Sequence, residues 1–153
     1  MKRLLTLWPA LFSRRTHGSA PVYRRERWTT PDADFVDVDF LADAPTAAET
    51  PMLVVFHGLE GSSRSHYCEA FAEVARERGW ACALPHFRGC SGEINHAPRA
   101  YHSGDHEEIG WILRRLRNEH MAAGGRVLVI GGGPAGLMAA EVLSAAGVAV
   151  HLF

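Results

Sequence analysis

The sequence contains few cysteines, no long apolar run and no excess of either charge. Its three cysteines are odd in number and lack C-x-x-C spacing, which argues against a disulfide framework and for a reducing, cytoplasmic compartment. No segment approaches the ~20 consecutive apolar residues of a membrane-spanning helix, so we expect no integral membrane segment. The net charge of −1 favours neither nucleic acid nor an acidic membrane as a partner.

The composition that remains is that of a globular protein. An apolar content of 47% and a charged content of 22% over 153 residues are typical of one domain with a sizeable core. The basic charge is concentrated at the N-terminus, where residues 1–28 hold seven lysines and arginines and one acid, Glu26. We expect residues 1–24 to form a basic arm, and a solvated extension accounts for it better than a contact with nucleic acid or membrane.

The first regular structure that the pattern predicts is an antiparallel hairpin. Residues 27–30 and 35–40 are its two strands, joined by a Pro-Asp-Ala-Asp turn. The second strand alternates apolar residues with Asp37 and Asp39, which predicts one buried face and one polar face.

The rest of the chain alternates short apolar runs with amphipathic stretches. Parallel strands are predicted at 52–56, 80–85, 126–130 and 148–153, and helices at 65–78, 105–118 and 134–146. The apolar stripes of the first two helices are expected at Tyr67, Ala70, Phe71, Val74 and Ala75, and at Ile109, Ile112, Leu113 and Leu116. The fold class is therefore α/β, with a mostly parallel sheet flanked by helices and led by the antiparallel hairpin.

Several short motifs occur in a specific order between residues 5 and 118. They are Thr6–Phe12, Asp34–Asp37, Phe56-His57-Gly58-Leu59-Glu60-Gly61-Ser62, His86-Phe87-Arg88-Gly89-Cys90-Ser91-Gly92-Glu93 and Tyr101–Asp105. In this order and spacing, the segment resembles the YheT-like branch of the α/β-hydrolase family. The resemblance implies esterase-like chemistry with a Ser/Asp/His triad, acting on a small-molecule ester or lipid.

The His-Gly pair after the 52–56 strand has a physical role in such a site. Gly58 lets the backbone turn sharply, so that a nearby N–H can point at a developing oxyanion. By the resemblance, His57 and Gly58 form the oxyanion loop and the N–H of Leu59 is one oxyanion donor. The second donor is expected directly after the nucleophile.

A nucleophile is the part that the sequence lacks. No serine of the 153 residues lies in a G-x-S-x-G context between a strand and a helix. The triad Asp and His of the family normally come from strand ends later than residue 153. We therefore predict that this 153-residue chain is an inactive fragment, because removing triad members leaves little catalysis. An esterase with an unconventional nucleophile remains an alternative.

Two other groups of polar residues, the histidines at 102 and 106 and the thiol at 90, are candidates for a metal or nucleophilic site. His102 and His106 are four residues apart, but no third ligand has a diagnostic spacing, so we expect no metal site. Cys90 lies in a Gly-rich loop, yet no base can be named for it, and a structural thiol is the simpler interpretation.

The last part of the chain carries a different motif. Gly131-Gly132-Gly133-Pro134-Ala135-Gly136 follows an apolar strand and opens an Ala-rich helix, as a G-x-G-x-x-G turn requires. Gly131 permits the tight turn, Gly133 the approach of a pyrophosphate and Gly136 close packing, while Pro134 and Ala135 begin the helix that faces the phosphates.

Residues 125–153 thereby resemble the N-terminus of a BaiN-like flavoprotein of the NAD(P)/FAD-dependent oxidoreductases. The motif allows FAD as a ligand, but the ribose-binding acid is expected ~20 residues past the motif, where the sequence ends. We therefore expect no tightly bound cofactor, and a nucleotide-binding module is the alternative function.

The predicted organisation has three parts. They are the arm 1–24, a partial hydrolase domain 25–120, and a partial dinucleotide-binding unit 125–153 packed on the same sheet. The chain would then be a hydrolase-like sheet truncated and completed by a Rossmann-type βαβ unit, a fusion in which Gly133 stands where the nucleophilic serine would be. Its open sheet edge predicts self-association.

Overall fold

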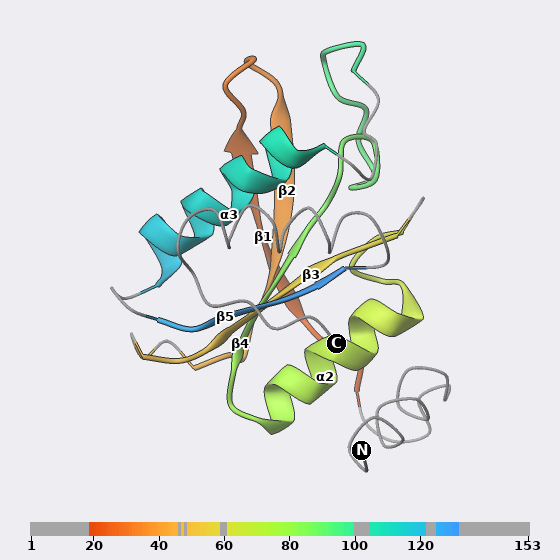
Figure 1. Cartoon of the computed structure of the whole chain (residues 1–153). Helices are drawn as coiled ribbons and strands as arrows, with labels where there is room; N and C mark the ends of the chain where they lie inside the picture. The colour runs from red at the N-terminus through yellow and green to blue at the C-terminus, as the bar shows by residue number, and fades with distance from the viewer. Residues whose placement is uncertain are drawn as a thin grey trace.

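A computed structural model describes residues 19–45, 47, 49–58, 61–99, 105–121 and 125–131 (Figure 1). They form one five-stranded sheet in the order β1-β2-β4-β3-β5, with helices on both faces. The elements are β1 (Tyr23–Thr29), β2 (Phe35–Leu41), β3 (Met52–Phe56), α2 (His66–Glu77), β4 (Ala81–Pro85), α3 (His106–His120) and β5 (Val127–Gly131). The predicted α/β class is confirmed.

The predicted hairpin is present, and its first strand is longer than expected. β1 and β2 are antiparallel, and β1 begins at Tyr23 rather than at residue 27. The Thr30 N–H donates to the Asp34 carbonyl at 2.9 Å and closes the turn, in which Ala33 adopts a left-handed φ of 60°. The end of the predicted arm therefore belongs to an ordered strand, while residues 1–18 lie outside the described residues.

The expectation of a polar, solvent-facing side on β2 is wrong. All seven residues of β2 are buried, including Asp37 and Asp39, which are 1% and 3% exposed. Arg27 and Arg25 lie directly opposite them on β1 and form bidentate pairs with their carboxylates. Asp37 and Asp39 can be buried here, although their alternation predicts a solvent-exposed face, because each carboxylate pairs with an arginine.

The three predicted parallel strands that the structure describes are present. β3 lies between β4 and β5 and is parallel to both, with Val54 opposite Ala83 on one side and Val129 on the other. Alternate residues of β3 contribute to two cores, as the period of a strand requires. Met52, Val54 and Phe56 belong to the core beneath α3, whereas Leu53 and Val55 belong to the core against α2.

Both described helices have the expected positions. Asp105 caps α3 by accepting a hydrogen bond from the Glu108 N–H, and the expected apolar stripe of α3 is buried. Gly79, with a φ of +63°, ends α2 as predicted. The stripe of α2 differs from the expectation, because Cys68, Ala72 and Ala75 are its buried residues. Tyr67 and Phe71 pack only at the edge of that core.

β5 joins β3 in the same hydrogen-bonded sheet as the earlier strands. Its five residues pair with Met52–Phe56 of β3. The predicted helix 134–146 and strand 148–153 lie outside the described residues. Among the residues that the structure describes, no helix is long and apolar enough to cross a membrane.

Candidate active site

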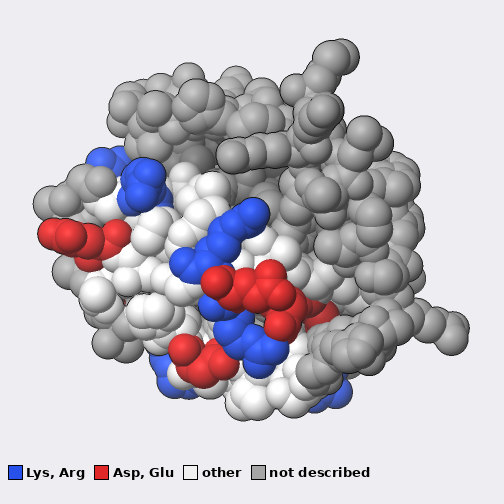
Figure 2. All heavy atoms as spheres, turned by 90° about the horizontal axis from the view of Figure 1, so that it is seen from below, with Lys and Arg blue, Asp and Glu red and all other residues white. Residues whose placement is uncertain are grey.

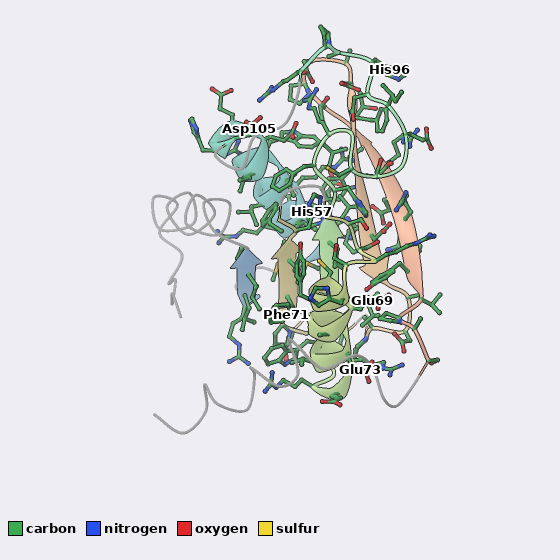
Figure 3. All side chains as sticks on the ribbon, turned by 90° about the vertical axis from the view of Figure 1, so that its right-hand side faces the viewer. His57, Glu69, Phe71, Glu73, His96 and Asp105 are labelled. Carbon is green, nitrogen blue, oxygen red and sulfur yellow. The ribbon has the colours of Figure 1, made fainter. Side chains whose placement is uncertain are left out.

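The carboxyl ends of three parallel strands meet at one edge of the sheet. His57 and Gly58 follow β3, His86 and Phe87 follow β4, and Gly131 ends β5. Phe56 lies opposite Gly131 in the ladder, so the segments after β3 and β5 start at the same level. Figure 3 shows His57 beside the tips of these strands. Open α/β sheets bind their ligands at this edge, outside the carboxyl ends of the strands.

His57 connects two of these segments with both of its ring nitrogens. Its Nδ1 lies 2.8 Å from the Gly58 carbonyl and its Nε2 lies 3.0 Å from the Phe87 N–H. A carbonyl only accepts and an N–H only donates, so Nδ1 carries the proton and Nε2 accepts. Burial and the nearby His86 lower the pKa of His57 to about 4. His57 is therefore a neutral clamp between the β3 and β4 ends, and its ring geometry does not suit a general base.

The Gly58 peptide is held from the other side by α2. The Gly58 N–H donates to the Tyr67 hydroxyl at 2.6 Å, and the Gly58 carbonyl accepts from the Gly61 N–H at 3.0 Å. A Cβ at Gly61 would lie 2.7 Å from the Tyr67 hydroxyl and 3.0 Å from the Gly58 oxygen. The second glycine of the motif is thus required by close packing of the loop.

Most backbone donors of the described part of this loop are already used. The N–H groups of Gly61 and Ser65 bond to loop carbonyls, and those of Ser62 and Arg64 bond to the hydroxyls of Ser65 and Ser62. These groups cannot also bind an oxyanion. Leu59, the donor expected from the resemblance, lies outside the described residues, so its role stays a prediction.

A serine, an aspartate and a histidine do meet near this edge, in an arrangement that the sequence did not predict. The Ser63 hydroxyl donates to Asp39 Oδ2 at 2.6 Å, and His86 Nε2 lies 2.8 Å from the same oxygen. Arg25 completes the set with a bidentate contact to Asp39. A nucleophilic triad requires the serine to donate to the histidine. Here both groups donate to the carboxylate, so the cluster ties the hairpin to the loops after β3 and β4.

A second buried network surrounds Arg88, whose side chain is 3% exposed. Its guanidinium donates to Glu108 at 2.6 Å, to Asp32 at 2.9 Å and to Asp34 at 3.1 Å. Burial alone would raise the pKa of Asp34, but donors from residues 95–97 and Phe35 hold it well below its usual range. Hydrogen bonding to Arg88 lowers the pKa of Asp32 to about 2. The motif residue Arg88 thus fixes the segment after β4 to the hairpin turn and to α3.

Metal ligation finds no support in the described part of the chain, and two of its cysteines, Cys68 and Cys82, are buried. It contains no group of three or more His, Cys, Asp or Glu side chains that could hold a metal ion. His106 begins α3, and its expected partner His102 lies outside the described residues. Burial raises the pKa of the Cys68 and Cys82 thiols to about 12, so neither ionises readily.

The nucleotide-binding residues fall mostly outside the described part. Gly131 is the last residue of β5, whereas Gly133, Pro134, Ala135 and Gly136 are not described.

On the face seen in Figure 2, acidic and basic side chains alternate rather than forming an area of one sign. On α2, for example, Arg76 forms an ion pair with Glu73, three residues earlier in the helix.

The chain is similar to curated hydrolases over most of its length. It is 46% identical to the putative esterase YheT of Escherichia coli over 116 residues, which cover 76% of this chain and 33% of the relative. It is 33% identical to an abhydrolase domain-containing protein of Dictyostelium discoideum, covering 61% of this chain and 24% of that protein. The chain therefore spans about a quarter to a third of the length of these relatives.

Solved structures give the same fold. A serine hydrolase without a lid from Xanthomonas campestris aligns with a TM-score of 0.60 at 16% identity, over 82% of this chain and 57% of that structure. A serine hydrolase homologue from Coxiella burnetii aligns with a TM-score of 0.60 at 14% identity, over 78% and 56% of the two chains. At such identities the likeness concerns the fold alone.

Residues 125–153 match a different family model, described as an FAD binding domain. This match begins two residues before β5, so it includes a strand that pairs with β3. Taken together, the comparisons show that most of the chain is similar in sequence to part of the putative esterase YheT, that its fold is that of α/β-hydrolases, and that its C-terminal part matches an FAD-binding family.

Proposed function

We propose that the described residues are the oxyanion-loop half of an esterase-like site, and that the 153-residue chain does not itself hydrolyse esters. The observation that carries the proposal is the parallel pairing of β3 with β5, in which Phe56 lies opposite Gly131. In α/β-hydrolases one oxyanion donor comes from the loop after such a strand, and the nucleophile lies on a strand-to-helix turn. The pairing supports an origin of both segments in one site.

The absence of hydrolysis follows from the residue types after β5. The sequence continues Gly131-Gly132-Gly133, so that glycine stands where the elbow pattern needs serine. Ser63 and His86, which do lie near the edge, both donate to Asp39 and are buried. The ester or lipid substrate of the homologues would therefore meet an oxyanion loop without an attacking group.

A direct assay tests this proposal. The purified 153-residue protein is incubated with p-nitrophenyl acetate and butyrate and, separately, with a fluorophosphonate probe. We expect no turnover above buffer and no covalent label on intact-mass analysis. Turnover or labelling that disappears in Ser63→Ala would contradict the proposal and identify the nucleophile. The matched control is Ser91→Ala, in the loop that follows β4.

We infer a second candidate function from the family match of residues 125–153, namely weak nucleotide binding at the Gly131–Gly136 turn. Three glycines after a parallel strand let backbone N–H groups approach a pyrophosphate. Titration with FAD, NAD or ADP, followed by flavin fluorescence and melting temperature, tests it. Absence of any response at millimolar ligand would remove this candidate. We further propose that the protein is cytoplasmic and that its two parts arose by fusion. We also propose that it self-associates through a sheet edge, and sedimentation velocity can measure this self-association.

A further inference from the structure

The outer edge of β1 is open among the residues that the structure describes. β1 is the first strand in the order of the sheet, and β2 is its neighbour on the inner side. Figure 3 shows the β1–β2 hairpin on the right of the sheet and β5, in blue, on the left. A strand of seven residues with an open edge is a template for another strand. Charged side chains on such an edge disfavour unrelated partners, so their arrangement decides which strand can pair.

The backbone groups at this edge belong to alternate residues. The Ala42 N–H donates to the Val22 carbonyl at 2.9 Å. At the other end of the strand, the Thr30 N–H donates to the Asp34 carbonyl at 2.9 Å. Because opposed residues of an antiparallel pair are alternately bonded and not bonded, the even-numbered residues of β1 use their N–H and C=O groups for β2. The groups at the open edge are those of the odd-numbered residues, Tyr23, Arg25, Arg27 and Thr29.

The charges of β1 differ in how fully they are compensated within the chain. Arg25 forms a bidentate pair with the buried carboxylate of Asp39, on the face of the sheet covered by the loop after β4. On the face beneath α3, Arg24 pairs with Glu26 of the same strand, and their side chains remain 59% and 26% exposed. Arg24 and Glu26 are therefore the charges that a strand added to this edge meets on the α3 face.

A second copy of β1 has a charge pattern that fits this edge. Two β1 strands can pair antiparallel about a twofold axis, with odd-numbered residues opposite odd-numbered residues. An axis at Arg25 places Arg24 of each copy opposite Glu26 of the other, whereas an axis one residue later or earlier places Glu26 opposite Glu26 or Arg24 opposite Arg24. Opposite charges across two strands stabilise the pair and like charges destabilise it. The pattern therefore selects the axis at Arg25, whose own charge Asp39 compensates.

The same register covers an exposed apolar side chain. Val22, directly before β1, is 68% exposed and would lie opposite Trp28 of the second copy. A hollow of about 500 Å³, lined by residues 29–31 and by α3, lies next to the position that the residues before β1 of the second copy would take. We propose that the protein forms a symmetric dimer by antiparallel pairing of two β1 strands, with Arg24 and Glu26 paired across the axis. This proposal specifies the self-association proposed above and does not depend on whether the chain hydrolyses esters.

Charge-reversal variants test the pairing in solution. Sedimentation velocity from low micromolar to near-millimolar protein should show a reversible monomer–dimer equilibrium that added sodium chloride weakens. Arg24→Glu alone and Glu26→Lys alone place like charges opposite each other, and each should raise the dissociation constant of the dimer at least roughly tenfold. An equimolar mixture of the two variants restores opposite charges at both positions and should form heterodimers. Glu73→Lys on α2 is the matched control, because it also reverses the acid of an ion pair, and it should leave the equilibrium unchanged.

Hydrogen exchange of the unchanged protein locates the contact. The amides of Tyr23, Arg25 and Arg27 should exchange rapidly in dilute solution and slowly in the dimer. The Trp28 amide, which faces β2, should be protected in both. Protection of the three odd-numbered amides at every concentration would mean that another segment of the chain covers the edge, and the proposal would be wrong.

Two further outcomes separate this proposal from self-association in general. Association that protects the amides of β5 and not those of β1, or a mixture of Arg24→Glu and Glu26→Lys no more associated than either variant alone, would overturn the β1 dimer and leave self-association standing. A protein that stays monomeric at every concentration would overturn both. The esterase assay described above is independent of each of these results.

Discussion

Replacement of Arg88 by methionine tests whether the hairpin turn, the segment after β4 and α3 are held together by a buried charge. Arg88 is the shared partner of Asp32, Asp34 and Glu108, and the side chains of Arg88, Asp34 and Glu108 are 3%, 1% and 3% exposed. Methionine keeps much of the length and apolar stem of arginine. The change therefore removes the guanidinium while retaining most of the packing.

The expected cost follows from what is left behind. Removing one partner of a buried ion pair costs about 3–5 kcal/mol, because the remaining charge is buried without compensation. Asp34 retains donors from residues 95–97, whereas the Glu108 carboxylate loses the hydrogen bond from Arg88. We therefore expect the variant to lose about 3–5 kcal/mol, a large part of the roughly 5–15 kcal/mol that stabilises a typical domain.

Urea unfolding at pH 7, followed by tryptophan fluorescence and circular dichroism, measures this loss. Arg114→Met is the matched control, since Arg114 is exposed on α3 and the substitution should change stability by no more than about 0.5 kcal/mol. The deficit of Arg88→Met should shrink in acid. The pKa of Asp32 and Asp34 is depressed in the folded state, so their contribution is present above about pH 4 and is lost as the pH falls through the folded values. A deficit below about 1 kcal/mol, or one that does not change with pH, would refute the reasoning.

Three other perturbations address the candidate site and its supports. The pKa of His57 is about 4 in the folded state against 6.5 for an exposed histidine, so the unfolded chain binds more protons between these values. The free energy of unfolding should therefore fall by about 3 kcal/mol from pH 6.5 to 4, and His57→Asn should flatten that slope in urea titrations. Gly61→Ala should cost about 1–3 kcal/mol because of the contacts with Tyr67 and Gly58, and Tyr67→Phe should relieve part of that cost in a double-mutant cycle; strict additivity would contradict this. Asp105→Ala should destabilise α3 by about 1 kcal/mol in thermal unfolding, whereas Asp105→Asn should retain most of the cap.

The residue pattern alone was sufficient to predict strands and helices whose side chains are buried at regular intervals along the chain. The 52–56 and 80–85 segments are apolar throughout and lie in the parallel sheet, because strands covered on both faces need no polar side. The apolar run 127–130 also lies in this sheet, as the partly exposed strand β5. The buried stripe of α3 was likewise predicted from regularly spaced apolar residues. In α2 the prediction was correct for Ala75, but Cys68 and Ala72 are buried beside it in place of the larger Tyr67, Phe71 and Val74.

Pattern failed where partners distant in sequence change the environment. Asp37 and Asp39 look like a solvent-facing set until Arg25, Arg27 and the segment after β4 cover them. Nothing local identifies Ser63, Asp39 and His86 as neighbours, since they come from three separate parts of the chain. The hydrogen-bond network of Arg88 could not be predicted either. Asp34 precedes Arg88 by more than fifty residues, and Glu108 follows it on α3.

The sequence by itself determined the α/β class, the strand and helix periods, the His57-Gly58 pair after β3 and the run of glycines that begins at Gly131, since each depends on residues close together in the chain. Only the tertiary structure decided the strand order, the level at which β3 and β5 end, and the hydrogen bonds that make His57 a neutral clamp. The reason is physical: hydrogen-bond partners and burial set protonation and donor availability, and both are properties of contacts between distant segments.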